Sequence, residues 1–465
     1  MTLSTPSVVT GSAAPGKARQ ARLAALAERS VPRYTSYPTA PHFNAEVTGE
    51  TYGGWLAQLS PCTTLSLYLH VPFCAAMCSY CGCHTKVTRR AAPIEAYRGA
   101  LAAEIDLVAG LTTARRVHHL HWGGGTPTML GEKGLAAIVE RLARRFDFAE
   151  DLDHAIELDP RHVTSPLAVA LKRMGVTRAS LGVQDLNLHV QEAIGRVQPH
   201  EVVARAVAAL RDAGIAAISF DLMYGLPEQT EADLLRTIGL AAALTPDRIA
   251  LFGYAHVPWM KPHQRLIDKG KLPDAAARLA QAESARAALE ALGYKAIGFD
   301  HFARPTDPMA VAAHEQRLKR NFQGYTTDDA EVLVGLGASA IGRLPQGFVQ
   351  NAPDFAGYQR AVGTGRLATV RGLALTPEDR IRGEVIERLM CDFAVDLDAV
   401  AARFDLAPAM FDADLAGMAP LEGEGLVHRD GRKVVVAAEG RPLVRLVAAA
   451  FDARLAQAGR HSAAV

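Results

Sequence analysis

The stretch LYLHVPFCAAMCSYCGCHTKV, residues 67–87, joins the start of a sheet to a dense group of thiols. Alternating apolar residues predict a strand over Leu65–Val71, and Pro72 ends it. The loop that follows carries four cysteines, Cys74, Cys78, Cys81 and Cys83. The whole chain has only six cysteines, so this clustering predicts a metal or cluster site in a reducing compartment and not a disulfide framework.

The spacing Cys74-x3-Cys78-x2-Cys81 leaves two interpretations open. Three thiolates on one tight loop can hold three corners of a cubane iron–sulfur cluster and leave the fourth iron without a protein ligand. Four thiolates, with Cys83 as the fourth, can instead close around a structural zinc ion. Structural zinc sites usually draw paired ligands from two separated turns, so the crowding of all four thiols into one loop favours iron–sulfur.

Downstream of this loop, short apolar runs alternate with helical patterns. Strands are predicted at Leu65–Val71, Val117–Trp122, His154–Leu158, Arg178–Val183, Ala217–Leu222 and Arg248–Phe252. Apolar residues at i, i+3, i+4 and i+7 predict helices between them, among others over 94–110 and 200–215. Ser165-Pro166, with Ser165 as N-cap, and Thr230-x-x-Asp233 supply helix start signals. This alternation implies a parallel sheet with right-handed crossovers.

Polar residues near the ends of the predicted strands distinguish a barrel from an open sheet. Glu157 lies in the third strand, Gln184 follows the fourth, Asp221 lies near the end of the fifth and His256 follows the sixth. Functional groups at the carboxyl ends of successive parallel strands are typical of barrel active sites. We therefore expect an α/β fold with a partial (β/α)6 barrel.

A glycine run, HWGGGTPT at residues 121–128, follows the second strand. Residues without side chains allow a ligand to approach the backbone and offer it N–H and C=O groups. The run has neither the G-x-G-x-x-G pattern of dinucleotide-binding folds nor the Lys-Ser/Thr of a P-loop.

The flanking segments differ from the barrel in composition. Residues 1–15 are small and polar, and we expect them to be disordered. Residues 17–30 predict a short amphipathic helix, although their Arg-rich, acid-poor composition also fits a transit peptide. We divide the chain into a lead-in (1–30), an extended segment over the active site (31–60), the barrel with its extension (61–363) and a C-terminal domain (364–465).

The C-terminal domain reads as mostly helical with one hairpin. Thr376-Pro377-x-Asp379 predicts a cap for a helix to about Met390, and helical patterns follow at 396–404, 407–418 and 441–457. Asp430-Gly431 predicts a hairpin turn. Helices plus a hairpin resemble a winged-helix module, but its acidic residues favour a packing role over DNA binding.

Composition excludes several classes of function. The 50 basic and 49 acidic residues give a net charge of +1, which argues against a nucleic-acid or acidic-membrane binder. No apolar run approaches the roughly 18 residues of a membrane span. We expect a cytoplasmic monomer.

Together the cysteine loop after one strand and Gly-Gly-Gly-Thr-Pro after the next resemble the radical S-adenosylmethionine (radical SAM) superfamily. Further segments resemble one of its families, the oxygen-independent coproporphyrinogen III oxidases, over about residues 31–457. These segments are RYTSYPTA (33–40), LYLHVPFC with CGC (67–83), HWGGGTPT (121–128), IELDPR (156–161), GVQD (182–185), FDLMYGLPEQT (220–230), DHFARP (300–305), RNFQGYTT (320–327) and LTPEDRIR (375–382).

The resemblance implies a defined chemistry. Such an enzyme holds a [4Fe–4S] cluster on the cysteines that match Cys74, Cys78 and Cys81, and its open iron binds SAM. One electron, from a reductant such as flavodoxin or ferredoxin, cleaves SAM to a 5′-deoxyadenosyl radical. The radical starts the decarboxylation of two propionates of coproporphyrinogen III to vinyl groups, giving protoporphyrinogen IX in haem biosynthesis. No catalytic side chain beyond the cluster and SAM is implied, and the role of Cys83 stays open.

The resemblance also implies which residues bind SAM. The matching positions are Tyr68, Tyr80, Gly124, Gly125, Thr126, Glu157, Gln184, Arg196, Asp221, Ala255 and Ile341, with Phe322 and Gln323 beside a second SAM. Taken singly, Tyr68 could be ordinary core and Arg196 a solvated charge, and only the joint pattern makes them site residues.

The substrate implied by the resemblance carries four carboxylates, so local basic groups have to bind it. Arg33, Arg161 and Arg304 lie in family-like segments, and we expect them to supply part of that charge. Two rival interpretations remain at this point. One is a haem chaperone with the same core and cluster; the other is a zinc-stabilised α/β binding protein.

Overall fold

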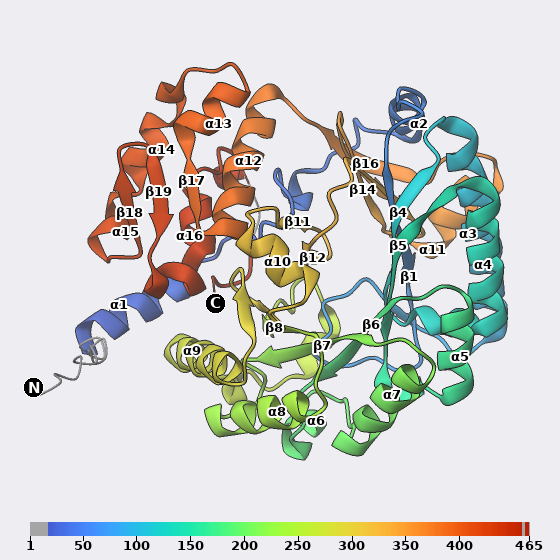
Figure 1. Ribbon diagram of the computed structural model, residues 1–465, viewed down its shortest axis with the longest axis horizontal. Helices are drawn as coiled ribbons and strands as arrows, with labels where there is room; N and C mark the ends of the chain where they lie inside the picture. The colour runs from blue at the N-terminus through green and yellow to red at the C-terminus, as the bar shows by residue number, and fades with distance from the viewer. Residues whose placement is uncertain (1–16, 458–460, 465) are drawn as a thin grey trace, which may run out of the picture.

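A twelve-stranded sheet dominates the computed structural model, which describes residues 17–457 and 461–464 (Figure 1). The strand order is β16-β15-β14-β13-β1-β4-β5-β6-β7-β8-β10-β9. Its central strands are parallel: β1 (Leu65–Val71), β4 (Arg116–Gly124), β5 (Asp147–Leu158), β6 (Arg178–Gln184), β7 (Ala217–Tyr224) and β8 (Arg248–Gly253). They confirm the six predicted strands, their sequential order and the partial (β/α)6 barrel.

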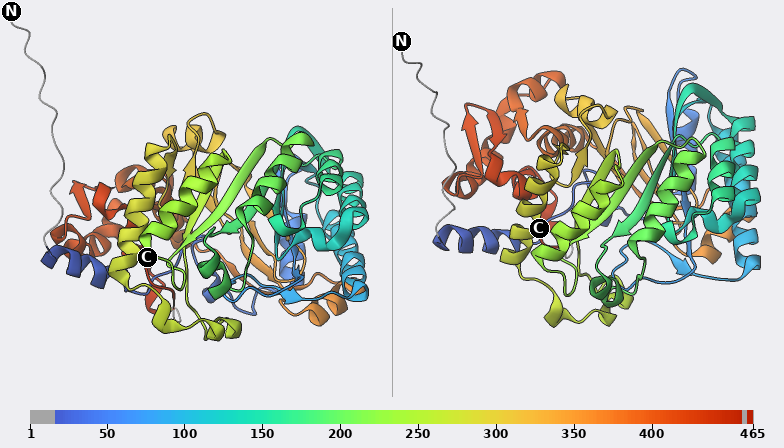
Figure 2. Two further views of the ribbon diagram at one scale, coloured as in Figure 1. Left: turned by 90° about the horizontal axis from the view of Figure 1, so that it is seen from below. Right: turned by 60° about the horizontal axis from the view of Figure 1, so that its bottom comes forward.

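Helices cover the outer face of the curved sheet (Figures 1 and 2). These are α3 (Ala91–Leu111), α4 (Gly131–Arg145), α5 (Ser165–Arg173), α7 (His200–Asp212), α8 (Glu231–Ala243) and α9 (Ala275–Ala291). Because strand side chains alternate between the two faces, Leu67 and Leu69 of β1 are buried in the main core, whereas Tyr68 and His70 face the interior of the barrel.

Short strands extend the sheet at both edges. β13 (Val332–Leu336) pairs in parallel with β1, and β14 (Ile341–Leu344), β15 (Gly347–Asn351) and β16 (Thr369–Ala374) continue from it antiparallel. Beyond β8 lie β10 (His301–Ala303) and β9 (Lys295–Ile297), both antiparallel. These strands could not be predicted individually from the sequence, because a run of three to six residues is too short to show a clear alternation of apolar and polar residues.

The N-terminal segment crosses from the C-terminal region to the barrel. The lead-in helix α1 (Lys17–Ala27) is present, and residues 31–39 are not helical. The expectation of an extended segment over 31–60 is wrong beyond that point, because Ala40–His42 form a 3-10 turn and Gly49–Ala57 form helix α2, which begins at a capping box of Thr48 and Thr51. Val31, Tyr34 and Tyr37 lie in the apolar core of the C-terminal region. Residues 1–15, which we expected to be disordered, lie outside the described residues.

The C-terminal region is mostly helical. It contains α12 (Pro377–Asp392), α13 (Leu397–Arg403), α14 (Asp412–Gly417), α15 (Ala419–Gly423) and α16 (Val444–Ala449), with the small sheet β17 (Ala394–Asp396), β19 (Lys433–Val436) and β18 (Val427–Asp430). The capping box of Thr376 and Asp379 and the hairpin at Asp430-Gly431 are both present.

Two local predictions were wrong. The N-cap of α5 is Thr164, whose side chain accepts from Leu167 N, and Ser165 is already helical. The last helix does not span 441–457 but only Val444–Ala449, because Pro442 lies in a preceding 3-10 turn and cannot donate to a regular α-helix.

In the described part of the chain, no helix combines the length and apolar composition needed to cross a membrane.

Candidate active site

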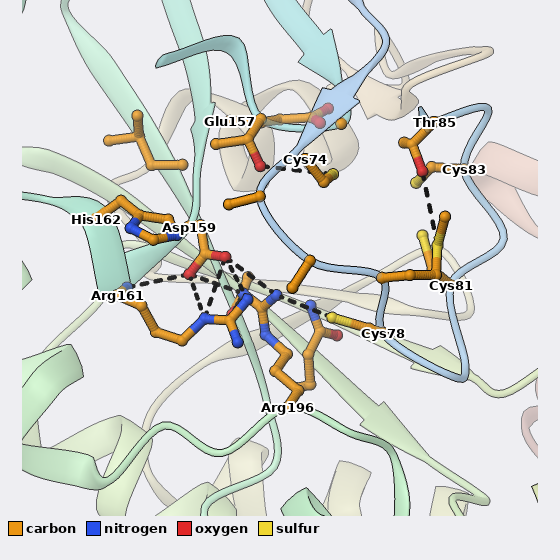
Figure 3. A pocket seen from close by; sticks show the side chains of 18 of the residues that line it. Cys74, Cys78, Cys81, Cys83, Thr85, Glu157, Asp159, Arg161, His162 and Arg196 are labelled. Carbon is orange, nitrogen blue, oxygen red and sulfur yellow. Dashed lines mark hydrogen bonds and ion pairs between the residues drawn. The ribbon is translucent and has the colours of Figure 1, made fainter. Parts of the chain in front are cut away.

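The cysteine loop, defined here as residues 72–88, leaves β1 at the carboxyl edge of the parallel strands. Two short strands, β2 (Phe73–Cys74) and β3 (Lys86–Val87), close it by pairing with each other. Four cysteines of the loop line one pocket, Cys74, Cys78, Cys81 and Cys83 (Figure 3). All six cysteines of the chain are free of disulfides.

Hydrogen-bond donors point at the sulfurs. Thr126 Oγ1 lies 3.7 Å from Cys74 Sγ, and Arg196 Nη1 lies 3.6 Å from Cys78 Sγ. A hydrogen bond from Cys83 lowers the pKa of Cys81 to about 6, whereas burial raises the pKa of Cys74. Donors directed at sulfur favour the thiolate, which is the form that binds metal.

The glycine run forms one wall of the pocket, and close packing requires its glycines. A Cβ atom at Gly125 would lie 2.5 Å from Phe73 O and 3.0 Å from Cys74 Sγ. A Cβ at Gly124, where φ is +108°, would lie 2.7 Å from the His70 ring. The end of β4 can therefore pack against the cysteine loop only because these positions lack side chains.

These residues fit an iron–sulfur cluster. Three thiols at the spacing Cys74-x3-Cys78-x2-Cys81 face one cavity, and the glycine wall keeps side chains out of it. The cavity extends past the thiols to the ends of β5, β6 and β7, so a second group can lie beside the sulfurs.

Eight of the thirteen residues expected to bind SAM line this same pocket. They are Tyr80, Gly124, Gly125, Thr126, Glu157, Gln184, Arg196 and Asp221. Glu157 accepts from Gly124 N at 3.3 Å and lies 3.2 Å from His121 Nε2. Burial, and then the nearby charge of Glu157, raise the pKa of Asp221 to about 7.

The other five expected residues do not line the pocket. Tyr68 lies beside Gly123 and is stacked on His121 at 5.9 Å between ring centroids. Ala255 follows β8, and its carbonyl accepts from Gln264, which also binds Tyr80 O. Phe322 and Ile341 pack in a separate small apolar cluster, and Gln323 lies at the turn between the short strands β11 (Lys319–Asn321) and β12 (Gly324–Thr326).

Asp159 is a site residue that the sequence reasoning missed. Its carboxylate accepts from Arg161 Nη2 at 2.6 Å, and Arg196 Nη2 lies 3.4 Å away (Figure 3). A signal was available, because Asp159 directly follows the third predicted strand and so had to lie at the same edge as Glu157.

A second missed group clamps the cysteine loop from the segment after β8. Lys261 Nζ donates to Cys83 O at 2.9 Å, His263 Nε2 lies 2.7 Å from Cys81 O, and Gln264 Nε2 donates to Tyr80 O at 2.9 Å. Nothing in the sequence links these segments, which are 178 to 184 residues apart.

The three arginines expected to bind the substrate lie in different places. Arg161 lines the pocket. Arg33 donates to Gly253 O at 3.0 Å, at the carboxyl end of β8. Arg304 lies at the opposite end of the barrel, because its backbone N bonds to Asp247 O just before β8 begins and its side chain stacks on Tyr294. The expectation for Arg304 is therefore wrong.

Comparison with known proteins agrees with this geometry. Residues 68–241 match the radical SAM superfamily, and residues 375–443 match the HemN C-terminal domain. The chain is 50% identical to an oxygen-independent coproporphyrinogen III oxidase of Bradyrhizobium diazoefficiens over 429 residues, covering 92% of this chain and 95% of that one. It is 40% identical to the protein of that name from Escherichia coli K12, covering 93% and 94%.

Comparison with a solved structure supports the same family assignment. The E. coli coproporphyrinogen III oxidase HemN, described as a radical SAM enzyme, superposes with a TM-score of 0.87 at 38% identity, covering 92% of this chain and 100% of that one. Fold and site thus define a radical SAM enzyme, and that class implies a [4Fe–4S] cluster and SAM. Within it, the chain belongs to the oxygen-independent coproporphyrinogen III oxidase family.

Proposed function

We propose that this protein converts coproporphyrinogen III to protoporphyrinogen IX without oxygen, by oxidative decarboxylation of two propionate side chains to vinyl groups. The observation that carries the proposal is the pocket in which three cysteines of one loop meet the expected SAM-binding residues of β4 to β7. Family membership over more than nine-tenths of the chain supports the substrate.

The residues divide into three tasks in this proposal. Cys74, Cys78 and Cys81 would hold the cluster. When bound, the cluster and SAM supply the 5′-deoxyadenosyl radical that removes a hydrogen atom from the substrate. Glu157 and Asp221 accept hydrogen bonds from bound SAM, and Arg196 is positioned to pair with a carboxylate.

The remaining expectations belong to the same proposal. Phe322 and Gln323 belong to the neighbourhood of a second SAM, and Tyr68, Ala255 and Ile341 are further SAM-contacting residues. The chain works as a cytoplasmic monomer that receives electrons from a carrier such as flavodoxin or ferredoxin. Residues 31–60 cover the active site. The expected boundary at residue 363 needs one change, because β16 (Thr369–Ala374) belongs to the sheet of the barrel. The catalytic unit therefore runs from residue 61 to 374, and the residues after it form a packing domain.

Anaerobic turnover tests the function directly. Cluster-reconstituted protein receives coproporphyrinogen III, SAM and dithionite, and 5′-deoxyadenosine and porphyrin products are quantified together. We expect protoporphyrinogen IX to form along with deoxyadenosine. Deoxyadenosine without decarboxylation, together with stoichiometric haem binding, would instead indicate a haem chaperone.

The positions of Arg33 and Arg304 provide a test variant and a matched control for substrate binding. Arg33→Ala should raise the KM for coproporphyrinogen III about tenfold or more and leave uncoupled SAM cleavage intact, because a charge-assisted pair to a carboxylate is lost. Arg304→Ala, at the other end of the barrel, should leave that KM unchanged. Equal KM values for the two variants would remove Arg33 from the substrate site.

A further inference from the structure

Exposed apolar side chains concentrate on two short segments of the surface. Among the described residues, the five most exposed large apolar side chains are Leu266 (78%), Met260 (60%), Leu188 (58%), Val197 (48%) and Trp259 (47%). All five lie within residues 188–197 or 259–266. Soluble proteins rarely gather such residues unless a partner covers them.

Both segments are attached to the cysteine loop. The later one supplies the clamp of Lys261, His263 and Gln264 described above. The earlier one begins with α6 (Leu188–Ala193) and accepts a backbone hydrogen bond from Ser79 N at Ile194 O, 2.9 Å long.

A common small core unites the two segments beneath the surface. Its buried members include Ile194 and Ile267, and Tyr80 of the cysteine loop packs against it. Both views of Figure 2 show α6 beside the loop after β8. The exposed apolar residues therefore surround the part of the surface that lies over the cysteine loop.

This region is also strongly basic. Residues 83–90, 188–197 and 257–272 contain two acidic residues, Glu192 and Asp268. Apart from the buried Arg196, seven basic residues stand against them, of which Lys271 pairs with Glu228: Lys86, Arg89, Arg90, Lys261, Arg265, Lys269 and Lys271. The whole chain has a net charge of only +1, so the positive charge is a local property of this surface.

We propose that residues 83–90, 188–197 and 257–272 form a docking surface for an acidic one-electron carrier protein. The inference rests on the proposed function, which requires an electron from outside the chain. One electron leaves the reduced carrier and enters the cluster held by Cys74, Cys78 and Cys81; no bond forms or breaks, and no proton moves. Since electron transfer slows steeply with distance, the carrier has to bind over the cysteine loop.

The chemistry of the surface favours this partner over others. Basic residues around an apolar centre attract an acidic protein over a distance and then hold it through apolar contacts. A second copy of this chain on the same face would bring basic groups against basic groups. Redox encounters are typically small and transient, so a patch built on a few short segments is large enough.

Binding to flavodoxin provides the test. The affinity of the cluster-loaded protein for flavodoxin is measured by titration calorimetry at low and at high ionic strength. The variants are Arg265→Glu/Lys269→Glu and Leu266→Ser, and the matched controls elsewhere on the surface are Lys133→Glu/Lys295→Glu and Leu292→Ser. We expect the double charge reversal to weaken binding about tenfold or more at low salt and to flatten its salt dependence.

Turnover separates this proposal from the proposed function. Leu266→Ser and the double reversal should slow flavodoxin-driven deoxyadenosine formation and leave dithionite-driven formation unchanged. Equal affinities for variants and controls, or no binding by the wild type, would overturn the docking surface. A raised KM for coproporphyrinogen III with unchanged flavodoxin binding would overturn it too, and would make the patch a substrate entrance. Failure of dithionite-driven turnover in the wild type would refute the proposed function alone.

Discussion

Strand β5 carries a carboxylate at each end of the barrel interior, and the two have opposite environments. Asp153, toward the amino end, accepts from Arg178 Nη2 at 2.7 Å and lies 3.8 Å from His119. Burial alone would raise the pKa of Asp153, but these two partners lower it overall. Glu157, four residues on, accepts from the Gly124 amide, lies 3.2 Å from His121 Nε2 and opens into the cysteine pocket.

The difference distinguishes a structural cluster of ion pairs, at the amino end of the barrel, from a binding site at its carboxyl end. At the amino end the charges satisfy one another, and Arg248 adds a two-oxygen pair with Asp307, at 2.9 Å to each oxygen. At the carboxyl end thiols, carboxylates and glycine amides face a cavity, ready for groups supplied from outside. Changes at the two ends should therefore affect stability and chemistry separately.

The strongest test removes a thiol at the open end. Cys78→Ser should lose the cluster, so that iron content, visible absorption and SAM cleavage fall to background, because two thiolates cannot hold a cubane on this loop. Its stability without the cluster should match that of the wild type. Cys62 is an exposed cysteine outside the pocket, so Cys62→Ser is the control and should keep its iron content, visible absorption and SAM cleavage. A cluster-loaded Cys78→Ser protein would show that Cys83 replaces it as a ligand.

The converse change disrupts the cluster of ion pairs at the amino end of the barrel. Asp153→Ala leaves Arg178 and His119 without their shared partner, and we expect the free energy of unfolding to fall by about 3–5 kcal/mol. Asp151→Ala on the same strand is the control, because that side chain is 85% exposed, and its effect should stay within about 0.5 kcal/mol. Urea unfolding of the cluster-free proteins measures both. Loss of SAM binding in folded Asp153→Ala protein would contradict the separation of the two ends.

A third carboxylate, Glu104, sharpens the comparison because it is buried with neutral partners only. It accepts from Gly337 N at 2.6 Å, Asn351 Nδ2 at 2.6 Å and Tyr358 OH at 2.7 Å. Burial raises its pKa from 4.5 to about 7. The folded state thus keeps a proton that the unfolded state has lost between these pH values, so stability falls as pH rises through this window.

Replacing Glu104 by glutamine should remove that pH dependence. Between pH 5 and pH 8, the stability of wild type relative to Glu104→Gln should drop by about 2–3 kcal/mol. Comparing the change with pH, and not the stability at one pH, cancels the hydrogen bonds that the substitution itself disturbs. Parallel pH profiles for the two proteins would show that Glu104 is ionised throughout.

The smallest expected effect is at the open end of β5. Glu157→Gln keeps the shape of the side chain and loses its charge, so the affinity for SAM should fall about tenfold, or about 1.4 kcal/mol. The free energy of unfolding should change by less than about 0.5 kcal/mol, since the glutamine side-chain oxygen can still accept from Gly124 N and from His121. Equilibrium binding and urea unfolding check the two parts. A large loss of stability would show that Glu157 stabilises the fold, as Asp153 does.

Sequence patterns predicted the parts of this molecule that depend on local periodicity. The six parallel strands, the capping boxes at Thr230 and Thr376 and the hairpin at Asp430 all follow from residues close together in the chain. The resemblance supplied a set of expected SAM-binding residues, of which eight share the cysteine pocket.

The parts that the sequence could not predict depend on tertiary contacts. Arg304 belongs to a family-like segment, but the antiparallel pairing of β10 with β8 carries it to the wrong end of the barrel. The clamp of Lys261 and His263 exists only because a distant loop folds over the cysteines. Hydrophobic periodicity contains no information about either arrangement.

That clamp has a consequence for the order in which the site is made. The three thiols fall within eight consecutive residues, whereas the groups that cover them are synthesised nearly 180 residues later. Contacts so far apart in the chain form late, because closing a long loop costs entropy before any bond is gained. The thiols are therefore among the first parts of the pocket to be translated and among the last to be shielded. The time available for metal delivery, and the time of exposure to oxidants, are both set by how fast the second half of the barrel folds.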